Sequence, residues 1–201
     1  ENVRWENDGQ AYFDGEVEPC INGIALAVGS YFGQPVEPIV TTILGQRLRD
    51  GGWNCWAEDG GAVSSFHSTM CVLDGLREWE AATGGTDASR DARFAGEEYL
   101  LERGLYRRRS TGTPADVRMT MLSFPTRWYH DILRGLEHFR LVDRRDPRLA
   151  DAIGLLRAKA DENGLFPYEN AHQGPQLFEF EQEGEGFPSR WVTLRALRVL
   201  R

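Results

Sequence analysis

Two kinds of hydrophobic segment alternate along the chain. Residues 35–49, 86–108 and 146–156 are apolar on one face only. In the first segment, for example, Val40 and Ile43 lie on the same side. This pattern predicts amphipathic helices. The segments between them are apolar or aromatic nearly all round, which predicts buried helices. No segment alternates as a strand over more than a few residues. The pattern therefore predicts an all-α fold in which outer helices cover inner ones.

A short sequence recurs where the inner segments begin. Phe-His-Ser stands at 66–68, Phe-Pro-Thr at 124–126 and Phe-Pro-Ser at 187–189, and a fainter copy stands at 18–20. The spacing is roughly 50–60 residues, which is long enough for two helices and a loop, so we expect a helical repeat.

The recurring sequence also predicts where the inner helices start. Ser68, Thr126 and Ser189 stand where a helix N-cap belongs, and Cys20 takes that place in the fainter copy. Long connections rich in Gly, Trp, Phe and Glu precede three of these starts, and long loops in compact domains are commonly functional. We therefore expect any site to lie near the inner-helix starts.

Composition narrows the classes of function. The net charge of −8 and the pI of about 5.1 argue against a nucleic-acid partner. No apolar run approaches the roughly 18–20 residues of a membrane span. The cysteines Cys20, Cys55 and Cys71 are odd in number and irregularly spaced, which favours a reducing, cytoplasmic setting over a disulfide framework. The chain opens without Met, and residues 1–5 are typical of a helix end, so we expect preceding residues to be missing.

Residues 46–53 read Gln-Arg-Leu-Arg-Asp-Gly-Gly-Trp. They resemble the Gln…Gly-x-Trp repeat motif of the α/α toroid found in squalene cyclases and protein prenyltransferase β subunits. In that superfamily the Gln caps an outer helix and the Trp stacks nearby, so that adjacent repeats are tied together. The resemblance implies that residues 1–201 form one partial (α/α) toroid domain with about four inner and three to four outer helices, without its N-terminal helix pairs.

The same resemblance implies a zinc site. In protein prenyltransferases an Asp-x-Cys at the start of one inner helix and a His at the start of the next bind zinc; here Glu18 and Cys20 open one inner helix and His67 opens the next. Glu replaces Asp, and His67 comes one residue early. Cys55 is a substitute ligand, by resemblance to the cysteine-and-histidine site of lanthionine cyclases. In the alternative, Cys20 is a small buried residue and His67 hydrogen-bonds a neighbouring helix end.

Arginines and tryptophans near the inner-helix starts predict a substrate pocket. Arg127 and Arg190 recur at equivalent places and are candidates for binding an anionic group. The alternative is ion pairing with the acidic loop at 179–185. Three tryptophans, Trp53, Trp128 and Trp191, are candidates for lining this pocket, because indole rings stabilise the carbocations of isoprenoids. In the alternative, they belong to the hydrophobic core.

These residues lead to two hypotheses. The first is an enzyme of prenyltransferase or terpenoid-cyclase type. It would bind zinc through the predicted ligands and act on an isoprenoid-like small molecule. The acidic motif with which squalene cyclases protonate an alkene does not occur in this sequence. The second is a toroid that binds a partner and has lost its active site. A sugar-active α/α barrel, which needs two carboxylates across a groove, is a third alternative that the acidic loop leaves open.

Overall fold

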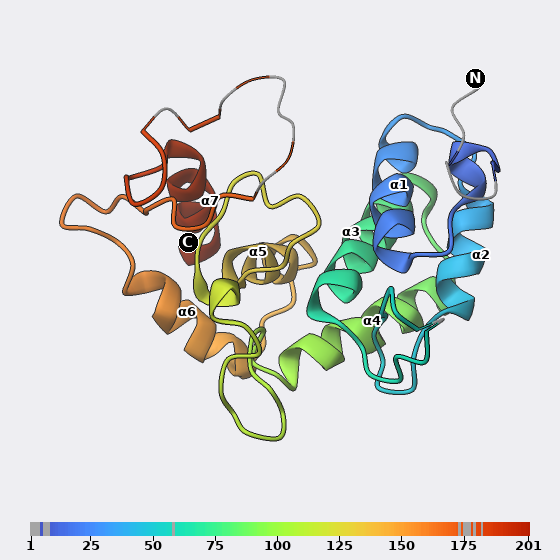
Figure 1. The fold of residues 1–201 in the computed structure, drawn as a ribbon, viewed down its shortest axis with the longest axis horizontal. Coiled ribbons are helices and arrows are strands. Elements are labelled where there is room, and N and C mark those ends of the chain that lie inside the picture. Colours follow the sequence, from blue (N-terminus) through green and yellow to red (C-terminus); the bar gives the residue numbers. More distant parts are fainter. Residues whose placement is uncertain are drawn as a thin grey trace. The chain divides into compact units, whose positions relative to one another are not determined.

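The computed structural model describes residues 5, 9–57, 59–172, 174, 178, 180, 181 and 183–201. Among these residues it contains seven α-helices, three 3-10 helices and no β-strand, which confirms the prediction of an all-α fold (Figure 1). The helices are α1 (Pro19–Tyr31), α2 (Glu37–Gly45), α3 (Phe66–Thr83), α4 (Asp87–Leu101), α5 (Ile132–Leu141), α6 (Ala150–Arg157) and α7 (Arg190–Leu200), with η1 (Tyr12–Asp14), η2 (Val117–Thr120) and η3 (Pro147–Leu149). The toroidal arrangement stays a prediction, and residues 1–4, read as the end of a helix, lie outside the described part.

The chain divides into two compact units, Glu1–Tyr99 and Leu100–Arg201, named here unit 1 and unit 2. Unit 1 holds η1, α1, α2, α3 and nearly all of α4. Unit 2 holds η2, α5, η3, α6 and α7. The predicted single toroid domain stays a prediction, and each unit is described by itself below.

In unit 1 the helices α1 and α3 lie against one another (Figure 1). Gly23 of α1 faces Gly75 of α3, and a Cβ atom added to Gly75 would lie 2.5 Å from the carbonyl oxygen of Gly23. The two backbones are therefore nearly in contact, which only glycine allows. Around this contact packs a core of buried residues that includes Leu26, Ile43 and Trp53. The close pairing fixes the start of α1 relative to α3, and this matters for the site described below.

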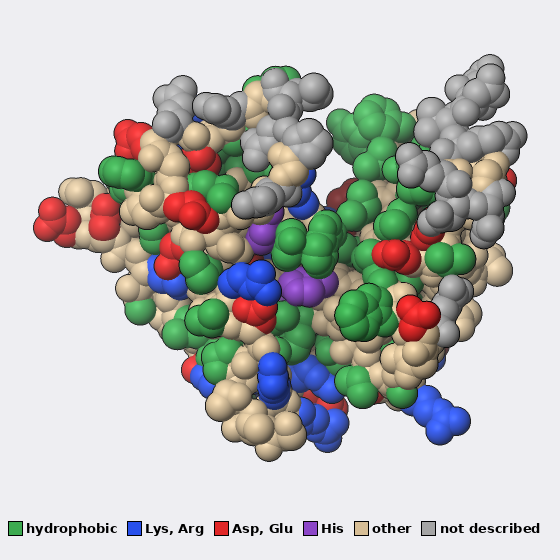
Figure 2. Space-filling view, viewed as in Figure 1, with side chains coloured by type: hydrophobic (Ala, Val, Ile, Leu, Met, Phe, Trp, Pro, Cys, Tyr) green, Lys and Arg blue, Asp and Glu red, His purple; other side chains and the backbone are tan. Residues whose placement is uncertain are grey.

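One face of α1 is not covered within the described residues of unit 1. Ile24 and Val28 are 38% and 42% exposed, and Tyr31 is 79% exposed. Figure 2 shows hydrophobic side chains gathered over α1. The expectation that this inner segment is buried all round is therefore wrong for that face.

Helix starts agree only in part with the predicted caps. Ser189 caps α7, because its Oγ accepts a hydrogen bond from the backbone N–H of Val192 at 3.0 Å. The prediction for Ser68 is wrong, since α3 begins earlier and Ser65 is its N-cap. The prediction for Cys20 is also wrong, because α1 already begins at Pro19, a residue whose fixed φ suits the first helical turn.

The predicted cap at Thr126 is wrong as well. Helix α5 begins at Ile132, and Asp131 caps it by accepting from the backbone N–H of Arg134 at 2.8 Å. Arg127 has a φ of 51°, in the left-handed region, so a right-handed helix cannot run through it. The guanidinium of Arg134 donates to the carbonyl oxygens of Arg127 and Tyr129, at 3.1 and 2.6 Å, and holds this non-helical stretch in place.

In unit 2 the helix α5 contacts both α6 and α7. Leu133 and Leu136 of α5 and Val192 of α7 are buried. The predicted amphipathic segments contain helices, but each helix is shorter than its pattern suggested, as in α6, which begins at Ala150 rather than near residue 146. Among the residues described in both units, no helix is long and apolar enough to cross a membrane.

Candidate metal centre

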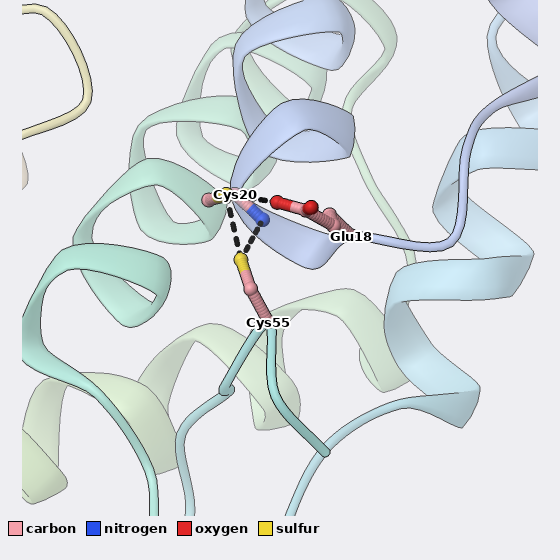
Figure 3. A group of neighbouring side chains, drawn as sticks. All are labelled: Glu18, Cys20 and Cys55. Atoms are coloured by element: carbon pink, nitrogen blue, oxygen red, sulfur yellow. Dashed lines mark hydrogen bonds between the residues drawn. The ribbon is translucent and has the colours of Figure 1, made fainter. Parts of the chain in front are cut away.

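Three predicted ligand residues come together at the start of α1 (Figure 3). Glu18 immediately precedes α1, Cys20 is its second residue, and Cys55 lies in the loop between α2 and α3. One carboxylate oxygen and the two sulfurs all lie within 4.8 Å of one another. The structure therefore joins residues from segments that are 35 positions apart in the chain.

The buried indole of Trp53 positions the loop that carries Cys55. Its Nε1–H donates to the carbonyl oxygen of Ile43 in α2 at 2.8 Å. Its backbone N–H donates to Oγ1 of Thr69 in α3 at 3.1 Å, and its carbonyl oxygen accepts from the N–H of Ser65 at 2.8 Å. The loop is thus attached to two helices next to Cys55. Trp53, which the sequence analysis named as a candidate substrate contact, lies in the core and is 0% exposed.

Hydrogen bonds converge on the Cys55 sulfur. The backbone N–H of Cys20 donates to it at 3.4 Å, and the hydroxyl of Ser68 donates at 3.2 Å. The Cys20 sulfur lies 2.6 Å from the Cys55 sulfur and 3.5 Å from a carboxylate oxygen of Glu18. Both cysteines are free thiols and half-buried.

These contacts divide the protonation of the two thiols. The hydrogen bond with Cys20 is the largest cause that lowers the pKa of Cys55, and the bond from Ser68 lowers it further against the opposing effect of burial. The same hydrogen bond, followed by burial, raises the pKa of Cys20. This direction agrees with the two other donors to Cys55, the hydroxyl of Ser68 and the backbone N–H of Cys20. These contacts favour the thiolate at Cys55 and the protonated thiol at Cys20.

The donor set fits zinc, which binds thiolates and carboxylates and is commonly four-coordinate. With Zn–S bonds of about 2.3 Å, tetrahedral geometry separates two ligating sulfurs by about 3.8 Å. The sulfurs of Cys20 and Cys55 are 2.6 Å apart, so roughly 1 Å of separation is needed to admit the ion. Both side chains are half-buried and begin at a helix end and a loop, so rotation about Cα–Cβ can supply this movement. Three protein ligands leave one coordination position open.

His67 is not a member of this three-residue group. It is the second residue of α3 and half-buried, next to Ser68, whose hydroxyl contacts Cys55. The third member of the group beside Glu18 and Cys20 is therefore Cys55, the predicted substitute ligand. A role for His67 as a ligand stays a prediction.

The predicted anion contacts lie in unit 2. A guanidinium nitrogen of Arg127 donates to the carbonyl oxygen of Gly174 at 3.1 Å. The guanidinium of Arg190 lies 5.5 Å from the ring centre of Trp191, a cation–π distance. Trp128 is 43% exposed and stacks on Tyr129.

Trp191 belongs to an aromatic cluster, since it stacks on Phe124 with ring centres 5.3 Å apart and donates through Nε1 to the carbonyl oxygen of Phe180. In the acidic loop, Glu181 accepts a hydrogen bond from the hydroxyl of Ser189, and Glu179 lies outside the described residues. The contact with Ser189 ties this part of the loop to the start of α7.

A second polar cluster in unit 2 was missed by the sequence reasoning. Ser123 donates its hydroxyl proton to a carboxylate oxygen of Asp131 at 2.5 Å, and Nε2 of His172 lies 3.1 Å from the same hydroxyl. The ring of His172 stacks on that of Tyr129 with centres 3.9 Å apart. Because Ser123 and His172 are 49 positions apart, no spacing signal could have joined them. The neighbouring His130 instead bonds the carbonyl oxygen of Leu105.

This cluster does not have the order of a nucleophilic triad. The single hydroxyl proton of Ser123 goes to Asp131, so Nε2 of His172 must donate to the Ser123 oxygen. His172 therefore cannot accept the proton of Ser123 in this arrangement, as a general base must. Burial is the largest cause that lowers the pKa of His172, which favours the neutral ring. The geometry is that of a structural network.

Comparison of the chain with protein-family models, with curated proteins and with solved structures finds no match. Membership of the toroid superfamily therefore stays a prediction from the sequence pattern alone. Within that motif, Gln46 follows the end of α2 and donates to the carbonyl oxygen of Val17, just before α1. Together with the bond from Trp53 to α2, this contact joins α2 to the segment that carries Glu18.

Proposed function

We propose that Glu18, Cys20 and Cys55 hold a zinc ion and that the chain is an enzyme of prenyltransferase or terpenoid-cyclase type. The observation that carries the proposal is the convergence of the carboxylate and the two sulfurs within 4.8 Å. Thiolate ligands favour zinc over magnesium or calcium, which prefer oxygen.

The residues around the three ligands support zinc binding. Ser68 and the backbone N–H of Cys20 donate to the Cys55 sulfur and favour its thiolate, the form that binds a metal. When bound, zinc would supply a Lewis acid that lowers the pKa of a thiol or water at the open position. Glu18 contributes a negative charge beside Cys20 and neutralises part of the charge of the ion.

The exposed face of α1 supports an apolar substrate. Ile24 and Val28 follow Cys20 at intervals of four residues, so all three share one side of the helix. Both aliphatic side chains are exposed, at 38% and 42%. An isoprenoid-like chain lying along this face would place its reactive end beside Cys20.

Metal analysis of the purified full chain tests the proposal. We expect one zinc per chain, which is lost in Cys20→Ala and in Cys55→Ala and kept in Cys71→Ala, the matched control in α3. His67→Ala decides whether His67 completes the site, because loss of zinc in that variant would add it to the ligands. Protein that binds no zinc when supplied with it contradicts the proposal.

The alternative is a non-catalytic protein that binds a partner. It is favoured by the exposure of Tyr31 and Phe32, at 79% and 67%, beyond the end of the face that would carry a substrate. Metal-free protein whose melting profile is unchanged by Cys20→Ala would support this alternative.

A further inference from the structure

The distance between the Cys20 and Cys55 sulfurs is closer to the length of a disulfide bond than to the separation of two sulfurs that bind one zinc ion. A disulfide bond is about 2.05 Å long, and zinc-bound sulfurs lie about 3.8 Å apart. From the separation of 2.6 Å, a bond needs an approach of roughly 0.5 Å, whereas zinc needs an opening of roughly 1 Å. Formation of the disulfide therefore needs the smaller movement of the two sulfurs.

The surroundings separate this pair from the third cysteine. Cys20 and Cys55 are half-buried, so a small reagent has partial access to both sulfurs. Cys71 is 0% exposed within α3. Oxidation by a reagent in solution should therefore select the pair and spare Cys71, which makes Cys71 an internal reference.

We propose that Cys20 and Cys55 form a reversible intramolecular disulfide by exchange with a low-molecular-weight disulfide. In the first step the Cys55 thiolate attacks one sulfur of that reagent, so that a mixed disulfide forms and one reagent thiolate leaves. In the second step the Cys20 sulfur attacks the Cys55 sulfur of the mixed disulfide, and the second reagent thiolate leaves and takes up the Cys20 proton. The protein loses two electrons and two thiol groups, and the reagent is reduced to two thiols.

The order of attack follows from the hydrogen bonds. Ser68 and the Cys20 backbone N–H both donate to the Cys55 sulfur, which favours its thiolate and makes it the attacking group. The Cys20 sulfur already lies 2.6 Å from Cys55, within reach for the second step.

Such a bond would act on the proposed metal site. A disulfide carries no charge on its sulfurs, so the two thiolate ligands are lost together and only Glu18 remains. Oxidation and zinc binding therefore exclude one another. The bond itself needs no metal, so the inference concerns the regulation of the proposed site without depending on its occupancy.

The experiment uses the full chain, stripped of metal with a chelator and treated with oxidised glutathione. We expect free thiols to fall from three to one per chain, a mass lower by about 2 Da, and a peptide that links Cys20 to Cys55. Dithiothreitol should restore all three thiols. Cys71→Ser should behave as the wild type does, and Cys20→Ser should retain glutathione on Cys55, because its resolving thiol is missing.

Three results would overturn the inference: three thiols that survive the treatment, a linked peptide that contains Cys71, or a mixed disulfide that persists in the wild type. A melting curve for each variant shows that it is folded when tested. Zinc binding is measured separately on reduced protein. If reduced protein binds zinc and the bond never forms, the inference alone fails; if the bond forms in protein that never binds zinc, only the proposed function fails.

Discussion

The polar cluster at the start of α1 in unit 1 differs from the polar cluster at the start of α5 in unit 2 in how completely its members are hydrogen-bonded. In unit 2, Ser123, Asp131 and His172 are 0%, 2% and 9% exposed and hydrogen-bond to one another through the Ser123 hydroxyl. In unit 1, Glu18, Cys20 and Cys55 are half-buried, and sulfur supplies two of the three ligand atoms.

The comparison separates a cluster that stabilises a fold from one that is suited to chemistry. A buried polar group is tolerated when its hydrogen bonds are made, and then it holds its neighbours in one arrangement. A half-buried thiolate next to a second thiol and a carboxylate remains able to take up a metal or to react. Substitutions in the two clusters should therefore affect different quantities.

The largest expected difference concerns the two carboxylates. Asp131→Ala removes the N-cap of α5 and leaves the buried hydroxyl of Ser123 without its acceptor. We expect the free energy of unfolding to fall by about 3–5 kcal/mol, the sum of a lost cap and a lost buried bond to a charged group. Urea unfolding measures this change.

Glu18→Ala is the counterpart in unit 1. Glu18 stands at the N-cap position of α1 but its side chain makes no cap hydrogen bond. We expect a loss of less than about 1 kcal/mol, together with weaker zinc binding. If both variants lost the same stability, the distinction between the two clusters would be wrong.

The sequence predicted part of the unit 1 cluster, because two of its members are close together in the chain. Glu18 and Cys20 are near neighbours, and the recurring Phe/Pro/Ser-Thr sequence directed attention to the right segment. The position of Cys55 next to them depends on the hydrogen bonds of Trp53 to two helices. The spacing of residues in the sequence does not predict these bonds. The motif at 46–53 marked the loop as special without giving its course.

The same limit explains the failures in unit 2. A cap signal is read from a few residues, so Thr126 looked like the start of a helix. The left-handed backbone at Arg127 and the bonds that Arg134 makes to nearby carbonyls decide otherwise, and these are tertiary effects. The link from Asp131 through Ser123 to His172 crosses a long connection in the sequence, so no local pattern indicates it.

A second, smaller effect should distinguish the two tryptophans of the loop between α2 and α3. Trp53→Phe keeps an aromatic ring but removes the Nε1–H that donates to Ile43. The carbonyl oxygen of Ile43 then loses a buried partner, and we expect the free energy of unfolding to fall by about 1–3 kcal/mol. Because this loop carries Cys55, zinc affinity should fall as well.

The matched control is Trp56→Phe, since Trp56 lies in the same loop but is 74% exposed. We expect it to change stability by less than about 0.5 kcal/mol. Chemical unfolding and zinc titration of both variants provide the comparison. Equal effects would show that Trp53 does not position the loop through its hydrogen bond.

A pH effect should come from the buried cluster of unit 2. Burial is the main cause that lowers the pKa of His172, nearby Arg127 adds to this, and Asp131 opposes it. The unfolded chain then takes up a proton near pH 6.5 that the folded chain refuses, so stability is fully present above that pH and falls as the pH drops below it. The slope contributed by His172 cannot exceed about 1.4 kcal/mol per pH unit.

His172→Gln isolates this contribution, because the amide keeps an N–H donor for Ser123 and does not titrate. Unfolding free energies of wild type and variant are compared at pH 7.5 and 5.5. We expect the wild type to lose more stability than the variant over this interval. A parallel pH dependence in the two proteins would assign the effect to other groups.

A small change in stability is expected for Ser68, beside the metal centre. Ser68 donates to the Cys55 sulfur and accepts from the Cys55 backbone N–H, each at 3.2 Å. Ser68→Ala should lower the free energy of unfolding by only about 1 kcal/mol. The reactivity of Cys55 should change more clearly, because the lost hydrogen bond helps to lower the pKa of this thiol. Less thiolate is then present at pH 7, and alkylation of Cys55 by iodoacetamide in metal-free protein should slow several-fold.

Ser65→Ala provides the control for that measurement, since Ser65 caps the same helix and its hydroxyl bonds the backbone N–H of Ser68 at 3.5 Å. It should lower stability by a similar amount and leave the alkylation rate of Cys55 nearly unchanged. If both serine variants slowed alkylation equally, the effect would come from loosening the start of α3. A slower rate in Ser68→Ala alone would mean that the unit 1 cluster is kept reactive by one hydroxyl whose own contribution to stability is small.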